Sequence, residues 1–171
     1  MSDMFSLAGR TALVTGGGSG IGQAISQVFA KAGATVEILE MDEAAGTATV
    51  AEIEAAGGRA AWTKCDVSQE ADVRAVIDAI SDRNGGLNIL VNNAGIASIG
   101  DAVTTTEAEF DRIYSVNVKG VRNVLHVGIP KLIASGGGAI LNMASTVSLM
   151  GIDDRFAYSM SKGAVLTMTY S

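Results

Sequence analysis

Short apolar runs alternate with longer amphipathic stretches along the whole chain. The short runs are rich in aliphatic and β-branched residues, as strands buried in a sheet are. The longer stretches repeat apolar residues every three or four positions, which is the period of a helix. The pattern predicts strands at 11–15, 35–39, 60–64, from 87 to a turn at 92–95, and at 138–145, and helices at 21–33, 43–58, 70–83, about 110–134 and from about 155 to the end.

Individual residues predict where some of these helices begin or break. Ser68 is placed to cap the helix at 70–83. Thr106 and Glu109 have the spacing of a capping box that opens another helix. We expect the long helical stretch that follows to break near Asn117.

Strands that alternate with helices, without tight hairpin signals, are typical of successive β-α-β units. The pattern therefore predicts an α/β fold: a Rossmann-type, doubly wound parallel β-sheet with helices on both faces in three layers. The 171 residues suit one domain. We expect a single domain over 1–171 that ends within the helix carrying Tyr158 and Lys162.

The composition argues against several other classes of protein. Hydrophobic residues make up 48% of the chain and charged residues 18%, and the net charge is −6, which disfavours a nucleic-acid partner. Residues 1–10 lack a signal-peptide pattern, and no apolar run could span a bilayer. Cys65 and His126 are the only residues of their kinds, so we expect a buried thiol, a structural histidine and no metal site. These features predict a cytoplasmic protein with no membrane partner.

A glycine-rich loop, TGGGSGIG at 15–22, joins the first predicted strand to the first predicted helix. Gly16, Gly20 and Gly22 would let the backbone turn tightly and approach a phosphate closely. The helix that follows would offer free N–H groups to a diphosphate. A P-loop is excluded because Gln23 stands where that motif needs a lysine.

An acidic residue, Glu40, ends the second predicted strand. A carboxylate there can accept hydrogen bonds from the ribose hydroxyls of NAD and would repel the 2′-phosphate of NADP. Ser19 and Met41 supply no positive charge for such a phosphate. These residues favour NAD over NADP. The alternative for Glu40 is that it is a solvated loop carboxylate that binds no ligand.

Tyr158 and Lys162 stand four positions apart in the last predicted helix, and Ser145 precedes Tyr158 by 13 positions. Residues at i and i+4 share one helix face, so the ammonium could stabilise a phenolate that exchanges a proton with an alcohol. Ser145 could bind the substrate oxygen. Taken alone, the pair would be interpreted as two ordinary neighbours on a helix surface.

The ordered motifs together resemble the classical short-chain dehydrogenase/reductase family over essentially the whole chain. They are TGGGSGIG, Asp66 in CDV, NNAG at 92–95, Asn117 in NVKG, Ser145 and the Tyr158–Lys162 pair. The resemblance implies a catalytic set of Asn117, Ser145, Tyr158 and Lys162. It implies cofactor contacts at Gly16, Ser19, Gly20, Ile21, Gly22, Glu40, Met41, Asp66, Val67, Asn93, Ala94, Gly95, Tyr158 and Lys162.

The resemblance further implies an NAD-dependent oxidoreductase that interconverts a small secondary alcohol and its ketone, in a homo-oligomer. Arg155 could pair with a substrate carboxylate, and the stretch around it resembles members that act on sugars and sugar acids; a surface salt bridge with Asp153 or Asp154 is the alternative. Two other functions stay open: a 3-oxoacyl thioester reductase that uses NADP, and a catalytically inactive nucleotide-binding fragment. Family members continue beyond the helix in which this chain ends.

Overall fold

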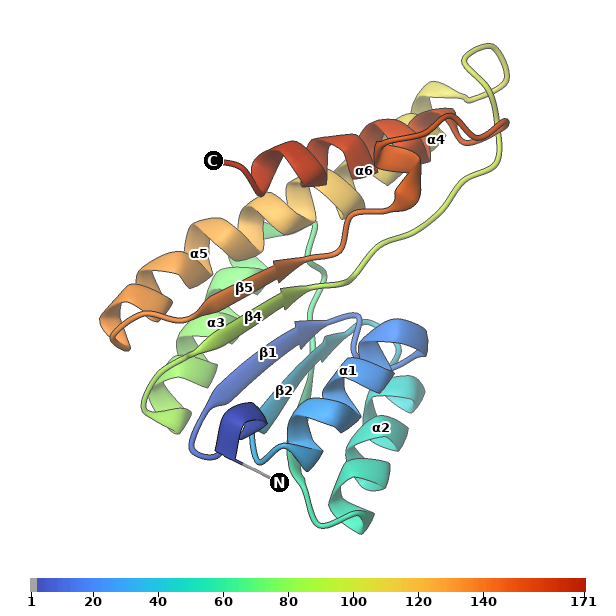
Figure 1. Cartoon of the computed structure of the whole chain (residues 1–171). Coiled ribbons are helices and arrows are strands. Elements are labelled where there is room, and N and C mark those ends of the chain that lie inside the picture. The colour runs from blue at the N-terminus through green and yellow to red at the C-terminus, as the bar shows by residue number, and fades with distance from the viewer. Residues whose placement is uncertain (1–2) are drawn as a thin grey trace.

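The computed structural model describes residues 3–171 and contains one five-stranded parallel sheet (Figure 1). The elements follow one another as η1 Asp3–Phe5, β1 Thr11–Thr15, α1 Gly20–Lys31, β2 Thr35–Glu40, α2 Glu43–Ala55, β3 Arg59–Lys64, α3 Glu70–Asn84, β4 Ile89–Asn92, α4 Glu107–Tyr114, η2 Ser115–Lys119, α5 Gly120–Ala134, β5 Ala139–Asn142, η3 Thr146–Ser148 and α6 Phe156–Met168. The strand order is β3-β2-β1-β4-β5. The doubly wound α/β fold predicted from the sequence is confirmed.

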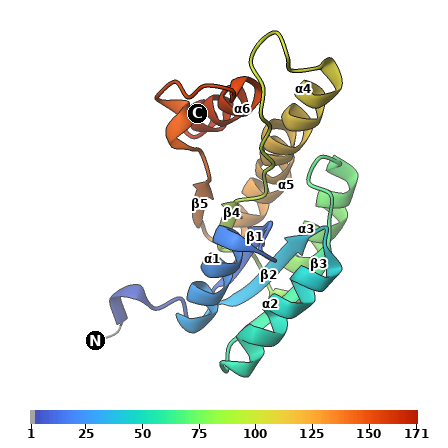
Figure 2. The same cartoon turned by 90° about the vertical axis from the view of Figure 1, so that its right-hand side faces the viewer.

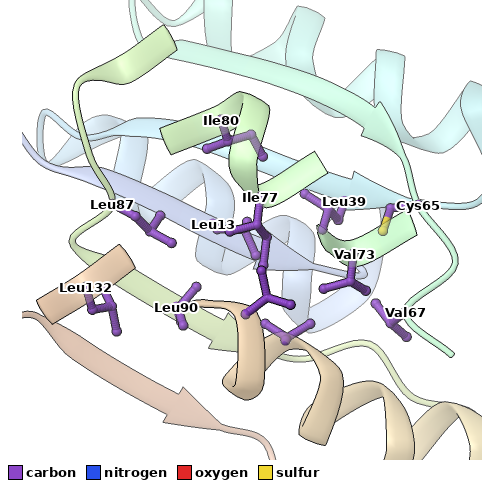
Figure 3. Close-up of a cluster of buried hydrophobic side chains, with 12 residues drawn as sticks. Leu13, Leu39, Cys65, Val67, Val73, Ile77, Ile80, Leu87, Leu90 and Leu132 are labelled. Carbon is purple, nitrogen blue, oxygen red and sulfur yellow. The ribbon is translucent and has the colours of Figure 1, made fainter. Parts of the chain in front are cut away.

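Helices cover the two faces of the sheet in pairs. In Figure 2, α1 and α3 lie on opposite sides of β1. The period of two along β1 turns Leu13 to one face and Ala12 and Val14 to the other. Leu13 joins the buried side chains of α3 and α5, among them Ile77 (Figure 3), while Ala12 and Val14 pack with α1 and α2.

The order of the strands determines where a ligand can bind. The chain moves outward from β1 to β3 and then returns to place β4 on the other side of β1. The loops after β1 and β4 therefore diverge above the carboxyl ends of these strands, where doubly wound sheets bind their ligands. α6 lies beyond the same ends of β4 and β5 (Figure 1).

Two local predictions that concern the surroundings of the site are wrong. Gln69 rather than Ser68 occupies the N-cap position of α3, and its side chain makes no capping hydrogen bond. The Asp66 carboxylate accepts the Ser68 N–H at 2.9 Å and holds the chain in a turn for one more residue. β5 ends at Asn142, three residues earlier than predicted, and Ser145 instead caps the turn η3.

The expected interruption of the long helix near Asn117 is confirmed. α4 begins at Glu107, where the Thr106 side chain accepts the Glu109 N–H at 3.2 Å. Between α4 and α5, residues 115–119 form one π-helical turn with Asn117 at its centre. Such turns are frequent at functional sites because the extra residue changes the direction of the side chains.

β5 differs from the expectation that both faces of the sheet are covered. Ile140 is 39% exposed and Leu141 44% exposed, although successive residues of a strand point to opposite faces. Among residues 3–171 no helix is both long enough and apolar enough to cross a membrane.

Candidate active site

One cavity of about 540 Å³ runs along the carboxyl edge of the sheet. It extends from Glu40 at the end of β2 and Asp66 after β3 to Tyr158 and Lys162 on α6. Thirteen of the residues that the sequence predicts as cofactor contacts line this cavity: Gly16, Ser19, Gly20, Ile21, Glu40, Met41, Asp66, Val67, Asn93, Ala94, Gly95, Tyr158 and Lys162. The tertiary structure thus brings residues that are up to 146 positions apart (Gly16 to Lys162) to a single cavity.

The glycine loop forms the middle of this cavity. Gly16 has φ +63°, and a Cβ on it would lie 2.9 Å from the Ala94 Cα. The glycine loop can therefore pass close to the loop after β4 only because this residue has no side chain. Gly22 is the one predicted cofactor position that does not line the cavity. A Cβ there would lie 2.1 Å from the Gly16 carbonyl oxygen, so Gly22 lets α1 pack against the loop.

The first turn of α1 points its N–H groups toward this loop. Ser19 is the N-cap, and its side chain does not bond the N–H groups of the helix. These donors and the positive end of the helix dipole suit an anion such as a diphosphate. The glycine loop and the N-terminus of α1, both at the cavity wall, therefore fit the diphosphate of a dinucleotide cofactor.

The loops after β1 and β4 are fastened to each other by side chains. The Asn93 amide donates to the carbonyls of Thr15 and Gly16, each at 3.0 Å. In return the buried Thr15 Oγ1 accepts the N–H groups of Asn93 and Ala94 at 3.0 Å. The sequence reasoning did not identify Thr15 as a functional residue; a polar residue ending an apolar strand was the signal for it.

Glu40 is held with its carboxylate at the rim of the cavity. Oε2 accepts the Gly18 N–H at 3.2 Å, and Oε1 accepts the N–H groups of Met41 at 2.8 Å and Asp42 at 3.3 Å. Three N–H donors orient this side chain, which distinguishes it from a freely solvated loop carboxylate. The exposed neighbour Met41 adds no charge.

The turn after β3 is held in place by contacts with α5. The buried Asn123 donates from Nδ2 to the Val67 carbonyl at 3.0 Å. A Cβ on Gly120 would lie 2.7 Å from Val67 Cγ2, so α5 approaches this turn closely. Asn123 is another residue that the sequence reasoning missed; a polar residue within the apolar stretch of α5 was its signal.

Tyr158 and Lys162 occupy the far end of the cavity. Lys162 is only 6% exposed, its Nζ lies 5.9 Å from the centre of the Tyr158 ring, and it donates to the Met143 carbonyl at 2.7 Å. Burial lowers the pKa of the Lys162 ammonium below its ordinary value. The predicted pairing of the two side chains on one helix face is present.

Asn117 supports the site without lining the cavity. Its side chain is hydrogen-bonded to the Ile96 backbone and donates to Ser161 Oγ on α6 at 2.9 Å. Ser161 Oγ in turn donates to the Tyr158 carbonyl at 2.8 Å. Ser161 was also not predicted from the sequence; its signal was a small polar residue three positions after Tyr158, on the same helix face.

Ser145 and Arg155 are the predicted substrate residues, and neither is among the residues that line this cavity. Ser145 Oγ accepts the Val147 N–H at 3.4 Å and caps η3. Arg155 lines a second cavity of about 530 Å³, beside the loop at 147–152, and its guanidinium donates to the Asp154 carbonyl at 2.8 Å. In the described part of the chain Arg155 forms no ion pair with Asp153 or Asp154.

Cys65 and His126 behave as packing and surface residues. Cys65 is buried at the cavity wall, and burial, with Asp72 and Asp66 nearby, raises the pKa of its thiol to about 12. His126 lies on α5 with Nε2 3.8 Å from Glu70, away from the cavity. The described residues contain no cluster of metal ligands.

Comparison with known proteins identifies the class to which this fold and site correspond. The family model for short chain dehydrogenases matches residues 10–171. The chain therefore belongs to the short-chain dehydrogenase family.

Three curated relatives come from different bacteria. An uncharacterized oxidoreductase of Thermotoga maritima is 40% identical over 95% of this chain and 64% of its own length. A 3-beta-hydroxysteroid dehydrogenase of Comamonas testosteroni is 40% identical over 95% of the chain and 63% of its own length. A D-threitol dehydrogenase of Mycolicibacterium smegmatis is 34% identical over 95% and 62%. The chain thus spans less than two thirds of the length of these relatives.

A solved structure of a metagenomic short-chain oxidoreductase in complex with NADP superposes with a TM-score of 0.92. It is 33% identical, and the match covers 96% of this chain and 75% of that one. The fold is shared closely, while the substrates named for the relatives differ.

Proposed function

We propose that the whole protein is an NAD-dependent oxidoreductase that interconverts a secondary alcohol and its ketone. The observation that carries the proposal is the single cavity that joins Glu40 to Tyr158 and Lys162. Glu40 suits the ribose hydroxyls of NAD, the glycine loop suits the diphosphate, and the Tyr158–Lys162 pair suits proton transfer. Bound NAD would supply the hydride acceptor.

The proposed chemistry assigns a separate task to each side chain. In alcohol oxidation the Tyr158 phenolate accepts the proton of the substrate hydroxyl, and the hydride would pass from the carbon that bears this hydroxyl to the acceptor that bound NAD supplies. The Lys162 ammonium, close to the ring, stabilises the phenolate that accepts this proton. Asn117 and Ser161 hold the helix that carries both residues. Ser145 directly follows Met143 and Ala144, which line the cavity, and from this position its hydroxyl would donate to the substrate oxygen.

NAD is the proposed cofactor although a structural relative binds NADP. The carboxylate of Glu40 would face the 2′-phosphate of NADP, and Met41 offers no cation to compensate. A reductase that uses NADP, such as one for 3-oxoacyl thioesters, would need a basic side chain near Ser19 or Met41. A sugar or sugar acid is the proposed substrate, and the threitol dehydrogenase among the relatives supports a polyol.

The experiment that tests the proposal has a binding stage and a turnover stage. Calorimetry should give tighter binding of NAD than of NADP, and incubation of the whole protein with NAD and a panel of alcohols and sugar acids should produce absorbance of reduced NAD. Tyr158→Phe should still bind NAD but lose turnover by roughly 10²–10⁴-fold. Near-normal turnover of Tyr158→Phe would reject the assigned acid/base, and a protein that binds NAD without any turnover would match the inactive alternative. Assembly into a homo-oligomer and a cytoplasmic location stay predictions from the sequence.

A further inference from the structure

Trp62, the only tryptophan of the chain, lies under the proposed ribose site without lining the cavity. It stands on β3, the edge strand, opposite Ile38 of β2. Its indole Nε1–H donates to the backbone carbonyl of Glu40 at 3.1 Å. The backbone of the residue that would choose the cofactor is therefore held by a side chain from the neighbouring strand.

The first turns of α2 rest directly on this indole. A Cβ on Gly46 would lie 2.1 Å from Trp62 Cδ1 and 2.4 Å from Nε1, closer than any real Cβ contact. Only glycine at position 46 lets the helix approach the ring so closely. The position of the indole therefore determines how near α2 comes to the sheet.

The same turns of α2 also hold the glycine loop. A Cβ on Gly18 would lie 2.8 Å from Glu40 Cγ and 3.0 Å from the Ala45 backbone, and the buried Thr49 Oγ1 donates to the Gly18 carbonyl at 3.1 Å. The Gly18 N–H in turn donates to the Glu40 carboxylate at 3.2 Å. The indole is therefore connected to the Glu40 carboxylate in two ways. One connection is its hydrogen bond to the Glu40 backbone, and the other runs through α2 and Gly18.

We propose that Trp62 is a positioning residue for cofactor selectivity: its indole N–H and ring hold Glu40 and α2 so that the carboxylate meets a ribose diol and opposes a 2′-phosphate. This inference rests on the proposed use of NAD. Because Trp62 does not line the cavity, its effect passes through Glu40.

The substitution Trp62→Phe tests the hydrogen bond, because it keeps an aromatic ring and removes the N–H donor. We expect NAD to bind about 3- to 10-fold more weakly, the range that one lost hydrogen bond gives. NADP should bind with unchanged or higher affinity, since a looser Glu40 opposes its phosphate less. The ratio of the dissociation constant of NADP to that of NAD should therefore fall. An unchanged ratio would overturn the proposal.

Phe29→Leu is the matched control for lost packing. Phe29 packs against the same apolar cluster from α1 but does not line the cavity. It should lower the melting temperature without changing the ratio of dissociation constants. A similar fall of the ratio in Phe29→Leu would show a general loss of packing and overturn the specific role of Trp62.

Two further measurements do not depend on Trp62→Phe folding. Gly46→Ala inserts a methyl group where the indole lies, so it should shift the tryptophan emission and lower the same ratio. In the unaltered protein the single indole N–H resonance should move at saturating NAD, although Trp62 does not touch the cofactor. A resonance that stays in place at saturating NAD would overturn the proposal, whereas failure of the unaltered protein to bind NAD would reject the proposed function itself.

Discussion

The side-chain amide of Asn117 forms a pair of hydrogen bonds with the backbone of Ile96. Oδ1 accepts the Ile96 N–H and Nδ2 donates to the Ile96 carbonyl, both at 2.8 Å. Nδ2 also donates to Ser161 Oγ, so one buried side chain joins the loop after β4, the π-helical turn and the helix that carries Tyr158.

This arrangement predicts that Asn117→Asp destabilises the protein. A carboxylate cannot donate to the Ile96 carbonyl or to Ser161, and the new charge would be buried. We expect a loss of about 2 kcal/mol or more in the free energy of unfolding, measured with urea. Asn142→Asp is the control, because it removes only an exposed donor to Thr169. Equal losses in the two variants would mean that Asn117 does not join the three segments in solution.

Lys162 is predicted to serve both cofactor binding and turnover. Lys162→Met keeps much of the side-chain volume but removes the ammonium that bonds the Met143 carbonyl and lies beside Tyr158. We expect weaker NAD binding and a turnover lower by orders of magnitude, whereas Tyr158→Phe should affect turnover alone. Lys162→Arg should recover only part of either property, because a planar guanidinium does not fit the place of an ammonium. Full NAD affinity in Lys162→Met would limit the lysine to proton transfer.

The cofactor preference should reverse when the charge at the ribose site is reversed. Replacing Glu40 by Ser and Met41 by Arg removes the repulsion of a 2′-phosphate and adds an attraction. We expect the whole protein to change its preference from NAD to NADP, measured as the ratio of kcat/KM for the two cofactors. An unchanged ratio would show that Glu40 is not the ribose contact, and Met41→Arg alone serves as the control for added charge.

Arg155 is predicted to recognise a substrate carboxylate if the substrate is a sugar acid. Its guanidinium borders the second cavity, and its one hydrogen bond is to a backbone carbonyl. Arg155→Ala should raise KM for sugar acids more than for the matching neutral sugars, and Arg155→Lys should do so less. If both substrate classes lose equally, the carboxylate contact is rejected.

Cys65 predicts how stability changes at alkaline pH. Burial raises the pKa of its thiol from 9.0 to about 12, so the unfolded chain loses this proton first as the pH rises. The stabilising contribution is fully present below pH 9 and is lost as the pH rises toward 12, at up to about 1.4 kcal/mol per pH unit. Cys65→Ala should therefore show a smaller fall of the free energy of unfolding over this range. Parallel curves for the two proteins would contradict the raised pKa, and native Cys65 should resist iodoacetamide until urea unfolds the chain.

The sequence by itself determined the features of this protein that depend on residues close together in the chain, namely its secondary structure and the spacing of its motifs. Apolar periodicity is a local property, so the strands, the helices and the break near Asn117 could be predicted with errors of a few residues at their ends. The i, i+4 spacing of Tyr158 and Lys162 fixes their shared helix face before any tertiary contact forms. The ordered motifs located the residues of one cavity because parallel strands bring their carboxyl ends to the same edge.

Only the tertiary structure decided how those residues are supported. Thr15 meets Asn93 across 78 positions, Trp62 reaches Glu40 across 22, and Asn117 reaches Ser161 across 44. Hydrogen bonds between distant segments depend on strand order and helix packing, and no local pattern records these. The structure also places Ser145 at the cap of η3 rather than within β5, and Arg155 at the second cavity. Local periodicity sets the elements, but the burial of their apolar faces against one another sets which polar groups meet.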